Sequence, residues 1–252
     1  MTKQEALFEY TLRAGDDSLI LGQRLSEWCG HGPVLEEDIA MTNIALDLIG
    51  QATSLLAYAA EVEGKDRDED QLAFLRYEKE YKNLLLVEHP NIDFGVTMAR
   101  QFLFDVFHYH FFKELTQSSD SQLAAIAEKS LKEVTYHVKH SSEWIIRLGD
   151  GTEESHTRIQ QAVNDLWEYT GEMFVMDQVD EIMIAEGVGV DLARIKTIWH
   201  DHVQQVFERA TLTMPEYGYM QLGGRQGRHT EYMGYLLSEM QYMQRAYPNM
   251  QW

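Results

Sequence analysis

The chain has 252 residues, of which 44% are hydrophobic and 25% are charged, proportions typical of a folded globular protein. Its 41 acidic residues outnumber its 21 lysines and arginines, and the formal net charge of −20 argues against nucleic acid or an anionic membrane surface as a partner. The single cysteine, Cys29, excludes an internal disulfide, and the chain contains neither an apolar signal core nor an apolar run of ~18 residues. We therefore expect a soluble cytoplasmic protein.

Several long segments carry apolar residues at alternating spacings of three and four, which predicts helices. The first half of the chain is expected to form long helices at 3–29, 35–62, 94–116 and 128–149, with a shorter one at 72–87. The inner row of the second helix is predicted to be Leu35, Ile39, Thr42, Leu46, Ile49, Thr53, Leu56 and Ala60. Four helices of ~30–40 Å joined by short connections predict an antiparallel four-helix bundle.

The second half is expected to add helices to this bundle. They are predicted at 153–186, with a break near 174–177, at 192–210, and after Thr230 in a tail rich in glycine, tyrosine and methionine. No strand precedes the GGRQG stretch at 223–227, so a phosphate-binding loop lacks its usual context. The predicted architecture is one all-α domain over residues 1–252, with a core bundle at 1–150 and additional helices and tail at 151–252.

A row of polar side chains borders the apolar stripe of the predicted helix 128–149. It consists of Ser130, Glu133, His137, His140 and Trp144. A carboxylate and imidazoles at the edge of a buried face are costly unless they are paired or bound to a metal ion. The purpose of this row therefore bears directly on the function.

Helix bundles that bind two irons supply one carboxylate from each of two helices and a Glu-x-x-His pair from each of the other two. Here Gly50 occupies the histidine position after Asp47, and Tyr136 occupies the one after Glu133. The other candidate ligands are Asp16 or Asp17, Asp105 with His108 three residues later, and the displaced His137. The acids are present without the full histidine pattern, which predicts a degenerate site at Asp47, Asp105, His108, Glu133 and His137, with no metal and no catalytic residue.

Other interpretations of these residues stay open. A mononuclear site built from Asp105, His108, Glu133 and His137 is geometrically possible, because residues four apart also share a helix face. In structural terms, Asp17 lies in a row with Arg13 and Arg24, which is typical of a salt-bridged acid. Asp47 would belong to a small polar patch, and an Asp105–His108 hydrogen bond would satisfy both groups.

Four segments resemble one protein family closely. They are DDSLILGQRLSEWCGHGPVLEEDIAMTNIALDLIGQA, LRYEKEYKNLLLVEHPNIDF, KEVTYHVKHSSEWIIRLGDGTEES and GGRQGRHTEYMGYLLSEMQYMQRAYPNMQW. The family is that of the non-catalytic, ferritin-like C subunits of the multicomponent 1,2-phenylacetyl-CoA epoxidase. The resemblance extends over almost the entire chain. It implies a bacterial cytoplasmic complex with a homologous catalytic subunit that carries the di-iron centre, further subunits and a separate reductase. The absent histidines agree with a supporting role.

Two other functions are considered beside this one: an oxygenase in its own right that uses the shifted ligand set, and a metal-storage or scaffolding bundle.

Because a CoA thioester is anionic, contact with this acidic chain would need a local basic segment. The strongest candidate is Arg76, Glu80, Tyr81, Lys82 and Asn83, where arginine and lysine alternate with aromatic rings. A solvated helix face with internal Glu–Lys pairs explains the same segment. Arg225 and Arg228 form a second basic cluster, which suits contact with a partner better.

Overall fold

The computed structural model describes residues 1–216, 218–248 and 250. Within this part the chain is helical and contains no strand, which confirms the predicted all-α class. Its internal contacts define two compact units: unit 1 comprises Met1–His89 and Gly223–Trp252, and unit 2 comprises Pro90–Leu222. The tail predicted at 151–252 is thus divided between the units, and the single-domain organisation stays a prediction.

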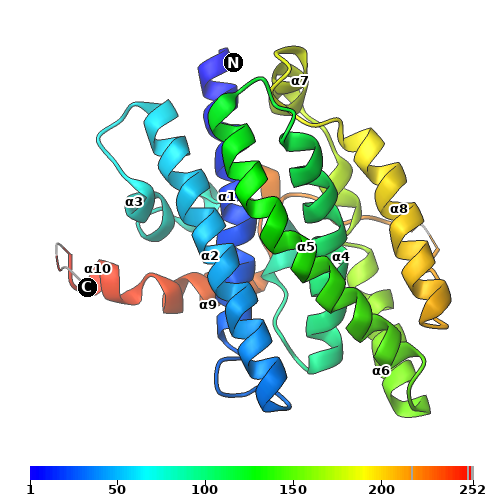
Figure 1. Ribbon diagram of the computed structural model, residues 1–252. Helices are drawn as coiled ribbons and strands as arrows, with labels where there is room; N and C mark the ends of the chain where they lie inside the picture. Colours follow the sequence, from blue (N-terminus) through cyan, green and yellow to red (C-terminus); the bar gives the residue numbers. More distant parts are fainter. Residues whose placement is uncertain (217, 249, 251–252) are drawn as a thin grey trace. The chain divides into compact units, whose positions relative to one another are not determined.

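Unit 1 is built on a pair of antiparallel helices, α1 (Lys3–Ser26) and α2 (Leu35–Glu63) (Figure 1). The antiparallel direction follows from Gln4 near the start of α1, whose Nε2 donates a hydrogen bond to the Val62 carbonyl near the end of α2 at 2.6 Å. Two glycines of α1 let the helices approach closely. A Cβ atom at Gly15 would lie 2.9 Å from the Leu56 side chain, and one at Gly22 would lie 3.3 Å from the Ala45 carbonyl.

The predicted inner row of α2 is wrong over its first half. Leu35, Leu46 and Ile39 are 71%, 61% and 52% exposed, whereas Leu56 and Ala60 near the end of the row are buried. The buried face instead contains Met41, Ile44, Ala45, Leu48, Ala52, Leu55 and Ala59. The cause is that α2 has apolar residues on two faces, and spacing alone cannot decide which face turns inward.

This double apolar character also makes α2 stand out by composition. Among the described residues it is the one helix long and apolar enough to cross a membrane by length and composition, and 44% of its most apolar window is buried inside the chain. A core helix of a soluble protein passes the same test, so this composition is weak evidence for a membrane span.

The remainder of unit 1 corrects a second prediction. Residues 72–87 do not form one helix: α3 (Glu69–Phe74) ends early, and two short 3₁₀ helices follow, η1 (Glu78–Glu80) and η2 (Leu85–Glu88). The backbone N–H groups of Lys82 and Leu84 donate to the carboxylates of Asp16 and Asp17 on α1, at 2.8 and 2.7 Å. Those tertiary hydrogen bonds replace the ones that a continuous helix would have made. The tail contributes η4 (Gly224–Gln226), α9 (Glu231–Met240) and α10 (Tyr242–Ala246).

Unit 2 contains the helical hairpin of α4 (Phe94–Leu115), close to its predicted bounds, and α5 (Ser121–Gly149), which begins seven residues before its predicted start. Of the predicted apolar stripe of α5, Ala127, Val134, Val138, Ser141 and Ile145 are buried, whereas Leu131 and Leu148 are half-buried. Further elements are α6 (Glu153–Trp167), η3 (Gly171–Phe174), α7 (Gln178–Ala185) and α8 (Leu192–Arg209). The break expected within 153–186 is confirmed. Trp199 of α8 is buried, and its indole N–H donates to the Leu103 carbonyl of α4 at 2.9 Å.

Candidate functional site

Two adjacent acids of α1, Asp16 and Asp17, are buried at the centre of unit 1. The guanidinium group of Arg76 forms a two-pronged ion pair with both carboxylate oxygens of Asp16, and its Nη1 lies 2.9 Å from Oδ2. The exposed fractions of the two side chains are 2% and 0%. Asp16 therefore has a dedicated cationic partner 60 residues away in sequence.

Asp17 makes the same kind of contact with the tail. Nη2 of Arg225 donates to Asp17 Oδ2 at 2.8 Å, and Nη1 lies 3.2 Å from Oδ1. Burial raises the pKa of the Asp17 carboxyl to about 6, and the nearby Arg225 charge opposes that rise. The prediction that Asp17 is a salt-bridged structural acid is confirmed, and the structure adds a partner that sequence proximity did not suggest.

A third buried carboxylate, Glu88, joins the end of the 76–88 segment to the tail. It accepts hydrogen bonds from the Asn83 amide at 2.8 Å and from both the N–H and the hydroxyl of Thr230 at 2.7 and 2.6 Å. The Nδ1 atom of His229 lies 2.6 Å from Oε1 of the same carboxylate. Burial alone would lower the pKa of His229, but the hydrogen bond and the charge of Glu88 raise it overall. We refer to Asp16, Asp17, Arg76, Glu88, Arg225 and His229 as the unit 1 ion network.

The glycine-rich stretch of the tail serves this network. Gly227 has a φ of 72°, and a Cβ atom there would lie 2.2 Å from the Lys79 carbonyl, so only glycine fits without displacing the backbone. This close approach lets Arg225 donate to the Lys82 carbonyl at 2.6 Å as well as to Asp17. The GGRQG stretch therefore fastens the tail to the 76–88 segment.

The residues predicted to contact CoA are placed mostly inside unit 1. Arg76, Tyr81 and Asn83 are 3%, 0% and 0% exposed. The Arg76 guanidinium lies 4.2 Å from the centre of the Tyr81 ring, and the Tyr81 hydroxyl is hydrogen-bonded to the Ala73 carbonyl. Glu80 is exposed and Lys82 is half-buried. The contact with CoA stays a prediction, and of the two cations among the predicted contact residues, Lys82 is the one outside the ion network.

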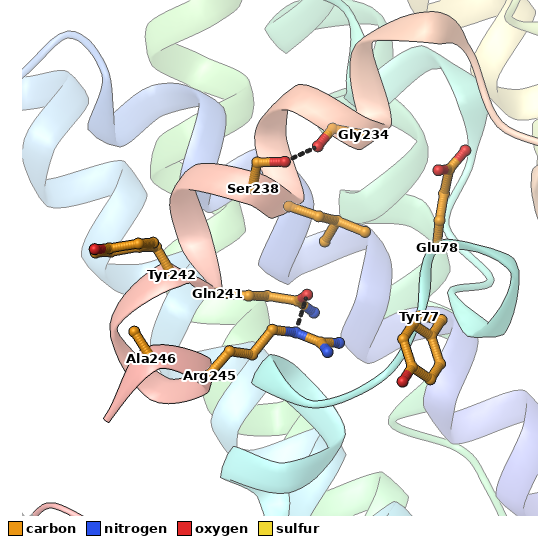
Figure 2. A pocket seen from close by; sticks show the side chains of 9 residues that line it. Tyr77, Glu78, Gly234, Ser238, Gln241, Tyr242, Arg245 and Ala246 are labelled. Atoms are coloured by element: carbon orange, nitrogen blue, oxygen red, sulfur yellow. Dashed lines mark hydrogen bonds between the residues drawn. The ribbon is translucent and has the colours of Figure 1, made fainter. Parts of the chain in front are cut away.

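A surface pocket of about 600 Å³ lies beside this segment (Figure 2). Its lining residues are Tyr77, Glu78, Gly234, Leu237, Ser238, Gln241, Tyr242, Arg245 and Ala246. The Arg245 guanidinium lies 5.0 Å from the centre of the Tyr77 ring, and its nitrogens donate to Gln241 Oε1 at 2.9 Å and to the Arg76 carbonyl at 2.8 Å. Its cation is thus already used to hold α10 against the 75–77 backbone.

In unit 2 the predicted Asp105 of α4 is fully buried. It accepts hydrogen bonds from the Gln101 amide at 2.6 Å and from the Ser141 hydroxyl of α5 at 2.8 Å, in place of the expected His108. Burial raises the pKa of the Asp105 carboxyl to about 6, with the charge of His137 opposing the rise. The carboxylate is therefore held between neutral donors.

His108 occupies an aromatic environment in the same unit. Its ring lies 4.7 Å from the Phe104 ring and 4.5 Å from the Phe112 ring, measured between centroids. Burial lowers the pKa of His108 to about 3, and the charge of His137 lowers it further. At neutral pH this histidine is an uncharged core residue.

These donor sets do not fit an iron pair. Asp16 and Asp17 are bound by arginines, and Asp105 is bound by an amide and a hydroxyl. Gly50 supplies no ligand, and Tyr136 is 47% exposed. Asp47 and Glu133 are half-buried. Among the described residues no group of three or more His, Cys, Asp or Glu side chains is arranged to hold a metal ion.

Replacing Asp105 with asparagine should separate a structural acid from a metal ligand. Because folding raises the pKa of this carboxyl above its ordinary value, its stabilising contribution is fully present below about pH 4 and is lost as the pH rises through about 6. We expect Asp105→Asn to gain stability relative to the wild type between about pH 4.5 and about pH 7.5, by up to about 3 kcal/mol. Urea unfolding at both pH values measures this difference, with the exposed Glu143→Gln as control. A gain that shrinks with rising pH contradicts the assignment.

Sequence reasoning missed Glu88 and His229. The available signal was a carboxylate placed directly after the apolar run Leu84–Val87, where an unpaired charge would be costly. The partner of that charge lies 141 residues away, so no local pattern identifies it.

Comparison with known proteins assigns the chain to a family. The family model described as "Phenylacetic acid catabolic protein" matches residues 1–252. The chain is also similar to the C subunit of the 1,2-phenylacetyl-CoA epoxidase of Escherichia coli (strain K12), with 48% identity over 246 residues, which cover 98% of this chain and 99% of that protein.

Proposed function

Because the chain belongs to the phenylacetic acid catabolic protein family, we propose that it is the C subunit of a 1,2-phenylacetyl-CoA epoxidase that acts in phenylacetate degradation. The observation that carries this proposal is the 48% identity to the relative of that name over 98% of the chain. A match of this extent covers both compact units, so the similarity is not limited to one part of the chain.

Within that complex the chain supports catalysis and does not carry it. The evidence for this part of the proposal is the environment of the acids that a ferritin-like oxygenase would use as iron ligands. In α1 they neutralise Arg76 and Arg225, and in α4 the acid is enclosed by Gln101 and Ser141. These contacts satisfy the carboxylates without metal and stabilise the fold.

The chemistry is then supplied by a partner. A homologous catalytic subunit would hold the di-iron centre, a reductase would deliver electrons, and the assembly would work in the cytoplasm on an aromatic CoA thioester. Lys82 and Glu80, the accessible members of the predicted CoA segment, would meet the carrier where the two subunits join.

The test is to co-express the chain with the catalytic subunit from the same genome and to measure the iron content of the complex and of each chain alone. We expect the two chains to co-purify, and the isolated chain to hold far less than one iron per molecule. One tightly bound iron per isolated chain, removed by Glu133→Ala or His137→Ala, would instead identify an oxygenase that uses the shifted ligand set. Large assemblies that load many irons per chain would identify a storage protein.

A further inference from the structure

A pair of histidines links two helices of unit 2. His110 lies in the last two turns of α4, and His202 lies near the middle of α8. Nε2 of His110 faces Nδ1 of His202 at 3.2 Å, and the planes of the two rings meet at 78°. Both side chains are half-buried, so solvent reaches the pair. Neither ring has a role in the proposed function.

The distance between the two facing nitrogens suits a metal ion. A tetrahedral zinc ion holds each nitrogen ligand at about 2.0–2.1 Å, which places two such nitrogens about 3.3 Å apart. The observed separation of 3.2 Å therefore requires no change in the spacing of the two helices. Coordination requires only that the two rings turn until both lone pairs meet at one point beside the line that joins the nitrogens.

Both imidazoles are also held in the form that binds metal ions. Burial lowers the pKa of His110 to about 4, with the charges of His202 and Lys113 acting in the same direction, and burial lowers the pKa of His202. Metal ions bind the neutral ring. In the hydrogen-bonded pair one ring donates its N–H to the other. When a metal ion binds, that proton moves to the other nitrogen of the same ring, so the pair needs no net loss of a proton.

We propose that His110 and His202 form a binding site for one divalent cation that prefers imidazole ligands, with Zn²⁺ as its representative. Imidazole suits zinc, copper and nickel, whereas Mg²⁺ and Ca²⁺ prefer oxygen. Because no third His, Cys, Asp or Glu among the described residues completes the set, water fills the remaining positions. The bound ion ties α8 to α4 and stays exchangeable, so a chelator removes it. The site needs no partner subunit and is independent of the proposed function.

The test is equilibrium dialysis of the untagged, EDTA-treated chain against Zn²⁺, followed by metal analysis. We expect the wild type to bind one more Zn²⁺ per chain than His110→Gln or His202→Gln. Losing one of two ligands should weaken this binding by at least about a hundredfold, since losing a group that only orients a ligand already costs about 10–100-fold. The control is His31→Gln, which removes an exposed histidine and should leave the zinc affinity unchanged.

Thermal unfolding provides a second readout. An ion that binds the folded chain stabilises it, so Zn²⁺ should raise the melting temperature of the wild type and of His31→Gln. It should not raise that of His110→Gln or His202→Gln, and Mg²⁺ should have no effect on any of the four proteins. Glutamine keeps a hydrogen-bonding group at both half-buried positions, so the fold should persist in EDTA.

Equal zinc stoichiometry and affinity in the wild type and in either folded variant would show an adventitious ion only and would overturn the site. If both substitutions unfold the chain, nitrogen NMR of the wild type with labelled histidine decides. One equivalent of Zn²⁺ should then shift one Nδ1 and one Nε2 resonance from two different rings, as the geometry requires. A shift confined to one ring, or to two Nε2 atoms, would overturn the site. In each case the proposed subunit function stands, because neither histidine takes part in it.

Discussion

Replacing Arg76 with alanine is expected to lower the free energy of unfolding by about 3–5 kcal/mol. The guanidinium group pairs with Asp16, and both side chains are almost completely buried. Removing one partner leaves a carboxylate in the interior without its counter-charge, which costs far more than losing an exposed ion pair. Since a domain is stable by only about 5–15 kcal/mol, we expect a large fall in melting temperature.

The control for Arg76→Ala is Lys79→Ala, which removes an exposed cation from the same segment. That change should stay within about 0.5 kcal/mol of the wild type. Arg76→Lys should be intermediate, because an ammonium group cannot reproduce the two-pronged contact. If denaturant unfolding gives equal stabilities for Arg76→Ala and Lys79→Ala, the ion network does not hold unit 1 together. Kinetic tests of CoA contact in this segment are therefore better made at Lys82 than at Arg76.

A loss of similar size is expected for Glu88→Ala. The carboxylate accepts hydrogen bonds from Asn83, His229 and Thr230, and its removal leaves several buried donors without an acceptor. Each unsatisfied donor costs about 1–3 kcal/mol, so the total should reach several kcal/mol. Glu88→Gln should cost less, because its amide oxygen still accepts from Thr230.

The pH dependence of the unfolding free energy shows whether His229 contributes to this cluster through its positive charge. Folding raises the pKa of His229, so the stabilisation from its protonated ring is fully present below its ordinary pKa and is lost as the pH rises through the folded value. The stability difference between wild type and His229→Gln should therefore decrease between about pH 6 and about pH 9. Urea unfolding at several pH values measures it, and a difference that grows with pH would show that the ring binds Glu88 in its neutral form.

The helices themselves were largely predictable because apolar spacing and capping residues are local features. Asp93, Asp120, Thr152 and Asp191 each cap the helix that follows, and the predicted starts agree well for three of them. The exception is α5, which begins at Ser121, well before the predicted start at Glu128. Local signals were sufficient here since each helix stabilises its own first turn.

The errors arose where distant residues decide the outcome. Residues 78–88 have helical composition, but their backbone N–H groups bind the carboxylates of α1. The face of α2 was misassigned because both of its faces carry apolar residues, so spacing alone does not identify the buried row.

In the candidate site, too, the features set by local sequence were predictable and those set by distant residues were not. The degenerate ligand pattern was visible in the sequence at Gly50 and Tyr136, because it concerns residues three apart on one helix. The roles of Arg76 and Arg225 were not visible, since their acids lie 60 and 208 residues away. Arg76 was therefore placed in a predicted CoA-binding segment without its role as the counter-charge of the buried Asp16.

The central claim, that this chain supports an epoxidase without performing its chemistry, is tested most directly by turnover of phenylacetyl-CoA in the reconstituted complex containing Asp105→Asn/Glu133→Gln. Complex assembly is checked by co-purification, and turnover is compared with that of the wild-type complex. The account predicts a rate within about twofold of the wild type, because neither acid takes part in the reaction. A fall of roughly a hundredfold or more in a stable, fully assembled complex, the size expected when a catalytic acid or base is removed, would contradict it.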